Sequence, residues 1–504
     1  MTEETRLHWK QSNAGYWHRD IDECEQFYQH YAKKERRCYP VTACASFQVK
    51  VTSVNPDVNV ESALQNAWVF LRHKHPTLGS HVEHNDEHDM WERLYVPFDA
   101  NEDVTSWLDS TFKIINTDKS ALSWFNNDAP CFHMPTVYMI NSELGTQQTV
   151  FLRCPHDITD GVGVLQLLDQ LFTHASFFYG QASGFKYPLP DIDLGTRLSP
   201  CLRVAASIPH SLSETQMQRF HELQTTNGDV YIHPCWLNLP PSISNGSAPV
   251  MKRIAISASR SISTQVLADC KNIALGVSLT HVFTASLTMA LRELQPRQEE
   301  AYTARYIGRS MINIRPYCRE PFNSPDHAAA AYHAVSAQAL GIDVKIPSSA
   351  DDGTKVDTLS ELAIKVRDFY QQIKPDPSKD TYEQALFAPQ VFQSLFPPPS
   401  VDPWAVQKTP FCPVSLSSIG NLATIVRSSG SVFELYQVWA ASEPINAGVV
   451  VFLGSWDGQI ELSSVFNTQY HKEEYMERFI TNILTHVFEG LGIDADGRQI
   501  AVVK

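Results

Sequence analysis

A β-prone run, a short polar loop and an amphipathic helix follow one another between residues 147 and 180. Residues 147–153 read QQTVFLR, and a second β-prone run, 136–141, precedes them across a turn at 142–145. This spacing predicts a hairpin. Apolar residues then recur at helical spacing from Val164 to Ala175, and Gly180 is predicted to end the helix. The loop CPHDITDG, residues 154–161, therefore joins the end of the second strand to the start of the helix. Such a strand-loop-helix unit requires an α/β structure.

Similar patterns indicate mixed α and β structure along the whole chain. Helical spacing of apolar residues predicts helices over 60–71, 282–294, 359–373 and 475–487. β-prone runs predict a strand over 306–317, ending at Arg315-Pro316, and a hairpin of 448–455 with 459–466 around Asp457-Gly458. The remaining long segments are predicted to be a ribbon or loop over 78–96 and a proline-rich connection over 375–413.

The length of the chain allows two or three domains, or one large fold with two halves around a shared cleft. Its 504 residues are 43% hydrophobic and 19% charged, which is enough apolar surface for a packed core without metals or disulfides. Proline, serine and glycine gather within 186–250. We therefore place the crossing between the halves there, and predict an N-terminal half of residues 1–215 and a C-terminal half of residues 216–504.

The charge balance of 40 basic and 55 acidic residues gives −15, which argues against nucleic acid or an anionic membrane as the main partner. The longest strongly apolar stretch, 447–456, is about half of the ~20 residues that a spanning helix needs. We expect no membrane span, no secretory signal and a cytoplasmic protein. The ten scattered cysteines predict reduced thiols, and we expect a monomer without a metal site.

The loop 156–161 is the strongest candidate for chemistry. A neutral imidazole at His156 can accept a proton from an alcohol that attacks an acyl carbon. Asp160 stands at the start of the helix, where a carboxylate can also serve simply as an N-cap. Gly161 is either a permissive helix start or a gap through which substrate passes.

The sequence His156-Asp-Ile-Thr-Asp160-Gly161 resembles the HxxxDG motif of the coenzyme-A-dependent acyltransferase superfamily. This superfamily includes chloramphenicol acetyltransferase, plant BAHD acyltransferases and peptide-synthetase condensation domains. Other segments are similar to it in the same order, namely residues 71–78 (LRHKHPTL), 312–316 (INIRP), 417–421 (SSIGN, similar to a late turn) and the final hairpin and helix. Within the superfamily, the run HDITDG before a leucine-rich helix is similar to fungal trichothecene 15-O-acetyltransferases. Pro155 stands where condensation domains carry a second histidine, which weighs against a peptide-synthetase role.

The resemblance implies two chloramphenicol-acetyltransferase-like halves, each a mixed sheet flanked by helices, with the active site in a tunnel between them. It implies that His156 is the general base and that Asp160 holds the loop through an ion pair, for which we nominate Arg315. A guanidinium pairs with a carboxylate in two-pronged geometry; the alternative for Arg315 is a solvent-facing strand end. Gly161, Asn313, Arg315 and Ser418 are expected on the substrate or coenzyme side. Asn313 and the serines could instead satisfy only nearby backbone groups.

The implied reaction is the transfer of an acetyl or short acyl group to a hydroxyl of a hydrophobic secondary metabolite. Its partners would be an alcohol acceptor and acetyl-CoA as co-substrate, with no permanently bound cofactor. A trichothecene mycotoxin, acylated at the 15-O position, is the expected acceptor. Two alternatives remain open: an acyl donor bound to a carrier protein, and a non-catalytic relative that binds a ligand in the same cleft.

Two further clusters allow a functional interpretation as well as a structural one. Five histidines within 73–88 could suggest a metal, but they lack a ligand spacing and are predicted to lie in a solvated loop. The basic cluster KKERR, residues 33–37, is predicted to be a solvated helix face, with contact to coenzyme phosphates as the alternative.

Overall fold

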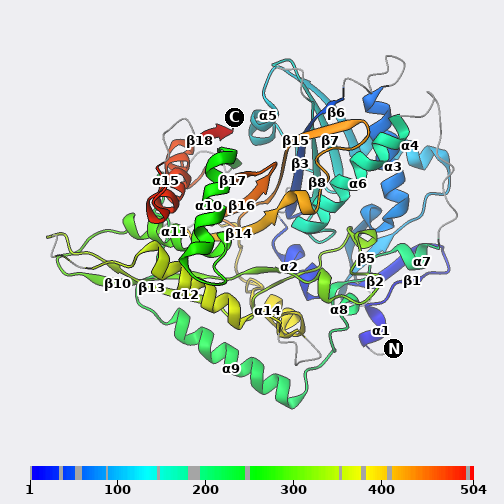
Figure 1. Ribbon diagram of the computed structural model, residues 1–504. Helices are drawn as coiled ribbons and strands as arrows, with labels where there is room; N and C mark the ends of the chain where they lie inside the picture. The colour runs from blue at the N-terminus through cyan, green and yellow to red at the C-terminus, as the bar shows by residue number, and fades with distance from the viewer. Residues whose placement is uncertain are drawn as a thin grey trace.

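The structure is a computed structural model of the whole chain, and its secondary structure gathers into two main sheets with helices packed on each (Figure 1). It describes residues 3–32, 38–50, 59–86, 89–144, 148–179, 193–243, 250–350, 353, 355–375, 382–405, 411–494 and 500–503. The cluster 33–37, His88, Gly145, Gln147 and the predicted helix stop at Gly180 lie outside these residues.

The first sheet carries the loop 156–161 at the end of one of its inner strands. Its order is β15-β3-β8-β7-β6, with β3 paired antiparallel to both β15 and β8. The strands are β3 (Pro40–Val49), β6 (Phe112–Thr117), β7 (Thr136–Ser142), β8 (Gln148–Pro155) and β15 (Phe433–Ser442). Helices α3 (Val60–Lys74) and α6 (Gly161–Tyr179) pack together on this sheet through a core that includes Leu64, Trp68 and Leu168 (Figure 1).

The second sheet has its own core, so each lobe buries an apolar face independently. Its order is β14-β16-β17-β9-β18, and β14 runs parallel to β16. The strands are β9 (Met251–Ala258), β14 (Val414–Asn421), β16 (Val449–Trp456), β17 (Gln459–Asn467) and β18 (Ile500–Val503). Its helices are α10 (Arg260–Ile273), α11 (Leu279–Glu293), α12 (Leu359–Gln372) and α15 (Glu473–Leu491). Helix α11 packs against both α12 and α15 in this core.

Smaller elements connect and flank the two lobes. Three small sheets are formed by β1 (Lys10–Gln11), β2 (Trp17–Asp20), β5 (Met90–Tyr95) and β4 (Ser80–Asn85); by β10 (Tyr302–Gly308) and β13 (Leu340–Ile346); and by β11 (Met311–Asn313) and β12 (His333–Val335). The remaining α-helices are α1 (Glu3–Arg6), α2 (Glu23–His30), α4 (Asn101–Thr111), α5 (Ala121–Asn127), α7 (Leu194–Arg197), α8 (Leu202–Ala205), α9 (Glu214–Tyr231), α13 (Glu383–Leu386) and α14 (Ala388–Ser394). Short 3-10 turns are η2 (Pro76–Gly79), η3 (Arg315–Tyr317), η4 (Pro325–His327) and η5 (Leu422–Thr424).

The main elements lie where the apolar periodicity of the sequence predicts them. The five predicted helices correspond to α3, α6, α11, α12 and α15, and the hairpin of β7 with β8 is confirmed. The second hairpin is β16 with β17, joined by Asp457 and Gly458 at φ 48° and 74°. Positive φ at both central residues is what a tight hairpin turn of this kind requires.

Three local predictions need correction. The strand predicted over 306–317 is two strands, β10 and β11, because each pairs with a different partner, and Arg315 lies in the turn η3 rather than at a strand end. Residues 417–421 are not a turn but the end of β14, where a register shift between Ser418 and Gly420 interrupts the pairing with β16. The described histidines of 73–88 lie on α3, its C-cap and the strand β4, so the segment is a helix end and a ribbon rather than a loop.

One strand of the first sheet comes from the C-terminal part of the chain. This strand is β15, which pairs with β3. The predicted boundary at 215/216 falls in the first turn of α9, and it stays a prediction. Within the described residues, no helix is long and apolar enough to cross a bilayer.

Candidate active site

A cavity of about 830 Å³ lies where the lobes meet. Its lining comes from the loop at 156–161, from β11 and β12, from β14 and from the end of β15. Of the residues predicted from the sequence, His156, Asp160, Gly161, Asn313 and Ser418 line this cavity, whereas Arg315 does not. Small-molecule sites span about 300–1,000 Å³, so the cavity can hold two reacting groups at once.

His156 sits directly after β8, and its backbone N–H donates to the carbonyl of Tyr39 over 2.7 Å. The residue is 7% exposed, and its ring stacks on that of Tyr28 with centroids 4.1 Å apart. Burial lowers the pKa of His156 below its usual 6.5, although backbone contacts and the carboxylates of Asp160 and Asp157 act in the opposite direction. The imidazole is therefore neutral near pH 7 and able to accept a proton.

Asp160 both caps helix α6 and anchors the loop. Its Oδ1 accepts from the backbone N–H groups of Val162 and Gly163 at 3.0 and 2.9 Å. Both carboxylate oxygens accept from Arg315 Nη1 at 2.6 Å, and Oδ2 also accepts from the N–H of Tyr332 at 2.8 Å. The expected ion pair is thus present, together with the capping role that was its alternative.

Arg315 is a buried bridge across the lobes. Its side chain is 3% exposed, and Nη2 donates to the carbonyl of Ala330 at 2.7 Å. Burial would raise the pKa of Asp160, but the positive charge of Arg315 holds that pKa below its usual value. The pair remains ionised, so the loop is fixed by a charge-assisted contact in a low-dielectric setting.

Gly163 makes room for this bridge. A Cβ at that position would lie 2.4 Å from the carbonyl oxygen of Ala328 and 2.5 Å from Arg315 Nη2. Because the carbonyl belongs to the backbone, any side chain would displace either the guanidinium or the segment at 328. The first turn of α6 therefore has a steric requirement for glycine at 163, which the sequence analysis did not predict.

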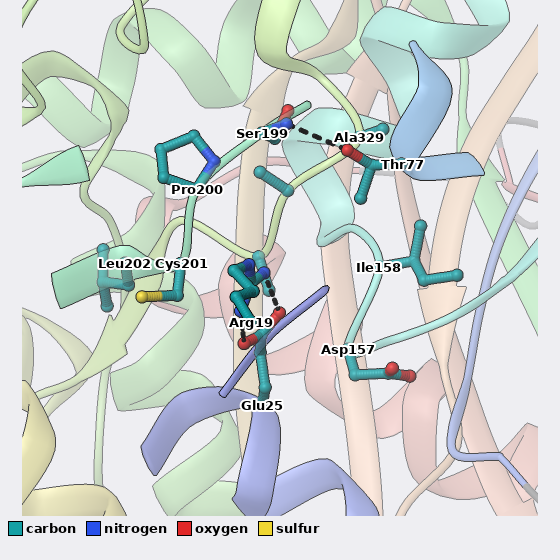
Figure 2. Close-up of a pocket in the computed structure, with 12 residues that line it drawn as sticks. Arg19, Glu25, Thr77, Asp157, Ile158, Ser199, Pro200, Cys201, Leu202 and Ala329 are labelled. Carbon is teal, nitrogen blue, oxygen red and sulfur yellow. Dashed lines mark hydrogen bonds and ion pairs between the residues drawn. The ribbon is translucent and has the colours of Figure 1, made fainter. Parts of the chain in front are cut away.

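A second buried network holds the other side of the loop. Arg93 Nη2 donates to the carboxylate of Asp157 at 2.7 Å and to its carbonyl at 3.0 Å, while Nε donates to Glu25 at 2.9 Å. Arg19 forms a two-pronged pair with Glu25 at 2.7 Å, drawn in Figure 2 beside Asp157. Burial favours the neutral carboxyl, but Arg19 and Arg93 lower the pKa of Glu25.

The polar cluster in Figure 2 encloses a space of about 10 Å³. The N–H of Ser199 donates to Thr77 Oγ1 at 3.0 Å in its wall. A volume of this size accommodates no more than about one water molecule. It is therefore part of the support for the loop, and the large cavity is the place for substrates.

The remaining predicted residues have separate positions. An ideal Cβ on Gly161 would meet nothing within 4 Å, so this glycine borders open space. Asn313 lines the cavity, and its Oδ1 accepts from the N–H of Arg315 at 3.1 Å, in agreement with a backbone-supporting role. The hydroxyl of Ser418 forms a hydrogen bond with that of Thr280 at 2.9 Å.

Tyr28, His333 and Arg93 also contact the loop or its histidine, and the sequence did not predict them. Each is distant in the chain from 156–161 and belongs to no motif that the sequence displays. The lone signal that could have pointed to a support residue is the second acid of the loop, Asp157, because a buried carboxylate requires a partner.

No triad or larger group of His, Cys, Asp and Glu side chains within the described part of the chain is arranged to hold a metal ion. The ten cysteines are thiols that form no disulfide. Burial raises the pKa of the Cys154 thiol next to the loop, so it is not an activated nucleophile.

The chain resembles two curated fungal proteins over nearly its whole length. Acetyltransferase pigO of Monascus ruber is 22% identical over 509 aligned residues, which cover 97% of this chain and 99% of that protein. O-acetyltransferase pigM of the same organism is 24% identical, with 97% and 88% covered. No family model matches the chain.

Solved structures agree on the fold. A trichothecene 15-O-acetyltransferase from Fusarium sporotrichioides superposes with a TM-score of 0.75 at 15% identity, covering 96% of this chain and 98% of that one. The first condensation domain of the calcium-dependent antibiotic synthetase gives 0.62 at 10% identity, with 97% and 99% covered. The chain is an acyltransferase with this two-lobed fold. The predicted fold class and enzyme class are confirmed.

Proposed function

We propose that the chain transfers an acetyl or short acyl group from acyl-CoA to a hydroxyl of a hydrophobic secondary metabolite, with His156 as general base. The observation that carries the proposal is a neutral, buried imidazole that opens onto the cavity while two buried ion-pair networks hold its loop. We assign the acceptor to the trichothecene-type sesquiterpenoids, acylated at a hydroxyl such as the 15-OH. The similarity to a solved trichothecene 15-O-acetyltransferase supports this choice.

The reaction needs both substrates in the cavity together. The hydroxyl proton of the acceptor passes to His156 as the oxygen attacks the thioester carbon. The tetrahedral intermediate then collapses, the carbon–sulfur bond breaks, and the CoA thiolate takes the proton back from the imidazolium. The transfer is direct, and the buried Cys154 thiol beside the loop is not activated to carry the acyl group. A base of this kind contributes about 10²- to 10⁴-fold in rate, and positioning of the two substrates contributes the rest.

Asp160 and Arg315 act on this reaction through position. Arg315 lies outside the cavity lining and Asp160 is held by four donors, so their task is to fix the strand end and the first turn of α6. Gly161 leaves the passage beside His156 open. Asn313 and Ser418 present polar groups to the substrates from the other lobe.

The test is incubation with acetyl-CoA as sole donor and a panel of deacetylated terpenoid alcohols, with product masses as readout. We expect a mass gain of one acetyl group on a trichothecene-type alcohol. Transfer solely from an acyl group on a carrier protein would replace the donor assignment. Ligand binding without any transfer would overturn the catalytic proposal and favour a non-catalytic relative.

A second panel of alcohols, offered with the same donor, tests the assignment of the acceptor separately from that of the donor. Alcohols of similar size but without the sesquiterpenoid skeleton, such as aromatic and polyketide alcohols, are offered with the same donor. Faster transfer to those alcohols would overturn the trichothecene assignment and leave the acyl-CoA assignment in place. We expect monomeric protein in these assays, which size-exclusion chromatography checks.

A further inference from the structure

A tyrosine from α2 covers one face of the His156 ring. The ring centroids of Tyr28 and His156 are 4.1 Å apart and the planes differ by 10°, so the two rings lie parallel and in contact. Tyr28 is 3% exposed and lines the cavity. Tyr39 is a second neighbour, but its centroid is 6.0 Å away at 54°, and this tilted geometry gives no stack.

The tyrosine ring is held in place by a second histidine. The hydroxyl of Tyr28 lies 2.8 Å from His333 Nε2 on β12, and His333 Nδ1 faces Asp160 Oδ2 at 3.8 Å. A carboxylate on that side favours a proton on Nδ1, which leaves Nε2 to accept the hydrogen bond from Tyr28. Asp160 therefore helps to position His156 in two ways. It holds the loop that carries His156, and it orients His333, which in turn holds Tyr28.

Both supporting groups stay neutral at working pH. Burial, followed by the nearby His156, lowers the pKa of His333 to about 3. Burial also raises the pKa of Tyr28 well above 10. A neutral phenol ring under the imidazole is therefore a constant feature of the site between about pH 5 and 9.

The stack has a consequence for proton transfer. When His156 accepts the acceptor's proton it becomes a cation, and a cation within about 6 Å of an aromatic centroid is attracted to the ring face. The groups that face His156 are Tyr28 from α2, Tyr39, His333 from β12 and the loop acids Asp157 and Asp160. Among these, Tyr28 is the one placed flat against the ring.

We propose that Tyr28, held by His333, is a positioning residue that fixes the plane of the His156 imidazole and stabilises its protonated form during acyl transfer. The proposal rests on the proposed function, because it assigns a role within that reaction. It adds two residues to the site from segments that the loop motif does not include.

The experiment measures kcat, KM and the pH profile of kcat/KM for Tyr28→Leu, Tyr28→Phe and His333→Gln. Loss of the aromatic face in Tyr28→Leu is expected to lower kcat about 10-fold with KM within about twofold, which matches the usual size of a buried cation–π contact. The acidic limb of the profile should move to lower pH, because the imidazolium loses stabilisation. Tyr28→Phe keeps the aromatic ring, so the acidic limb of its kcat/KM profile should stay in place while kcat falls about threefold. His333→Gln should give the same result as Tyr28→Phe.

Tyr470→Phe is the matched control, since it removes a buried tyrosine hydroxyl, bonded to Asn446 Oδ1 at 2.7 Å, from a residue that does not line the cavity. We expect a profile within about twofold of the wild type. If the acidic limb of the kcat/KM profile of Tyr28→Leu moved up toward pH 6.5, water would be reaching His156. Tyr28 would then only exclude solvent, which overturns the proposal. Wild-type kinetics in all Tyr28 variants would overturn it as well.

His156→Ala, assayed in parallel, keeps the two proposals separate. An inactive His156→Ala with unaltered Tyr28 variants contradicts the role of Tyr28 alone. An active His156→Ala contradicts the proposed function itself. Tyr28→Phe changes one buried atom and keeps the test decisive if Tyr28→Leu fails to fold.

Discussion

The loop 156–161 and the strand β14 line the same cavity but are held in different ways. Around the loop, Asp157 and Asp160 each have a buried arginine, and residues 156–160 are themselves buried. On β14, Ser418 is exposed and its side chain forms a hydrogen bond with another hydroxyl, that of Thr280. The proposed base therefore lies on a segment fixed by several buried contacts, whereas β14 can change its exposed residues at little cost in stability.

The largest effect should come from breaking the buried pair. Asp160→Ala leaves Arg315 buried without its anion, and we expect a loss of about 3–5 kcal/mol in the free energy of unfolding. Urea denaturation measures it. The double variant Asp160→Ala with Arg315→Met is the control, because it removes both charges and should recover part of the loss. A single variant within about 1 kcal/mol of the wild type would remove the contrast between the loop and β14.

The second network should matter less, because Arg93 keeps Glu25 as a partner when Asp157 is removed. Asp157→Ala is expected to cost about 2 kcal/mol of stability and about tenfold in kcat, through loosened positioning of His156. The exposed pair Lys119–Asp128 gives the control, since Asp128→Ala should cost under about 1 kcal/mol. Equal costs for the two variants would show that burial of the loop acids adds nothing.

A third variant tests the passage beside His156 rather than the stability of the loop. Gly161→Val places a branched side chain where the cavity is open, and we expect KM for the acceptor to rise at least about tenfold with stability within about 1 kcal/mol. Gly228→Val, on the exposed face of α9 with equal space around it, is the control and should leave KM unchanged. Unchanged steady-state kinetics for Gly161→Val would mean that no substrate passes there.

The smallest effect is expected on β14. Ser418→Ala should change kcat/KM less than about fivefold and stability by no more than about 0.5 kcal/mol, since its hydroxyl is exposed and bonded to Thr280. Steady-state kinetics check this. A hundredfold loss in kcat would assign Ser418 a hydrogen bond to the thioester oxygen in the transition state. In that case residues of both the loop 156–161 and β14 would take part in the reaction.

Local patterns predicted the elements and the loop, because apolar periodicity and a carboxylate at a helix start act over a few residues. The pair Asp160–Arg315 was also predictable, but only through the family resemblance that joins two distant motifs. The break between β10 and β11 was not, because it depends on β13 and β12, which follow later in the chain. Tyr28 and His333 reach His156 through tertiary packing alone, and a single sequence holds no signal of such contacts.

The pH dependence of the rate follows from the buried imidazole. Because burial lowers the pKa of His156 below 6.5, its base form persists to lower pH, and kcat/KM should begin to fall only below pH 6.5. The profile is measured with saturating acetyl-CoA and a limiting acceptor. If the acidic limb of the kcat/KM profile lay at or above pH 7, the general base would be either solvent-exposed or a group other than His156.

The most direct test of the account is the rate of acetyl transfer from acetyl-CoA by His156→Ala, with circular dichroism to verify the fold. The account predicts a loss of about 10²- to 10⁴-fold in kcat, with acetyl-CoA still bound. Retention of more than about a tenth of the wild-type rate would contradict a general base at this position.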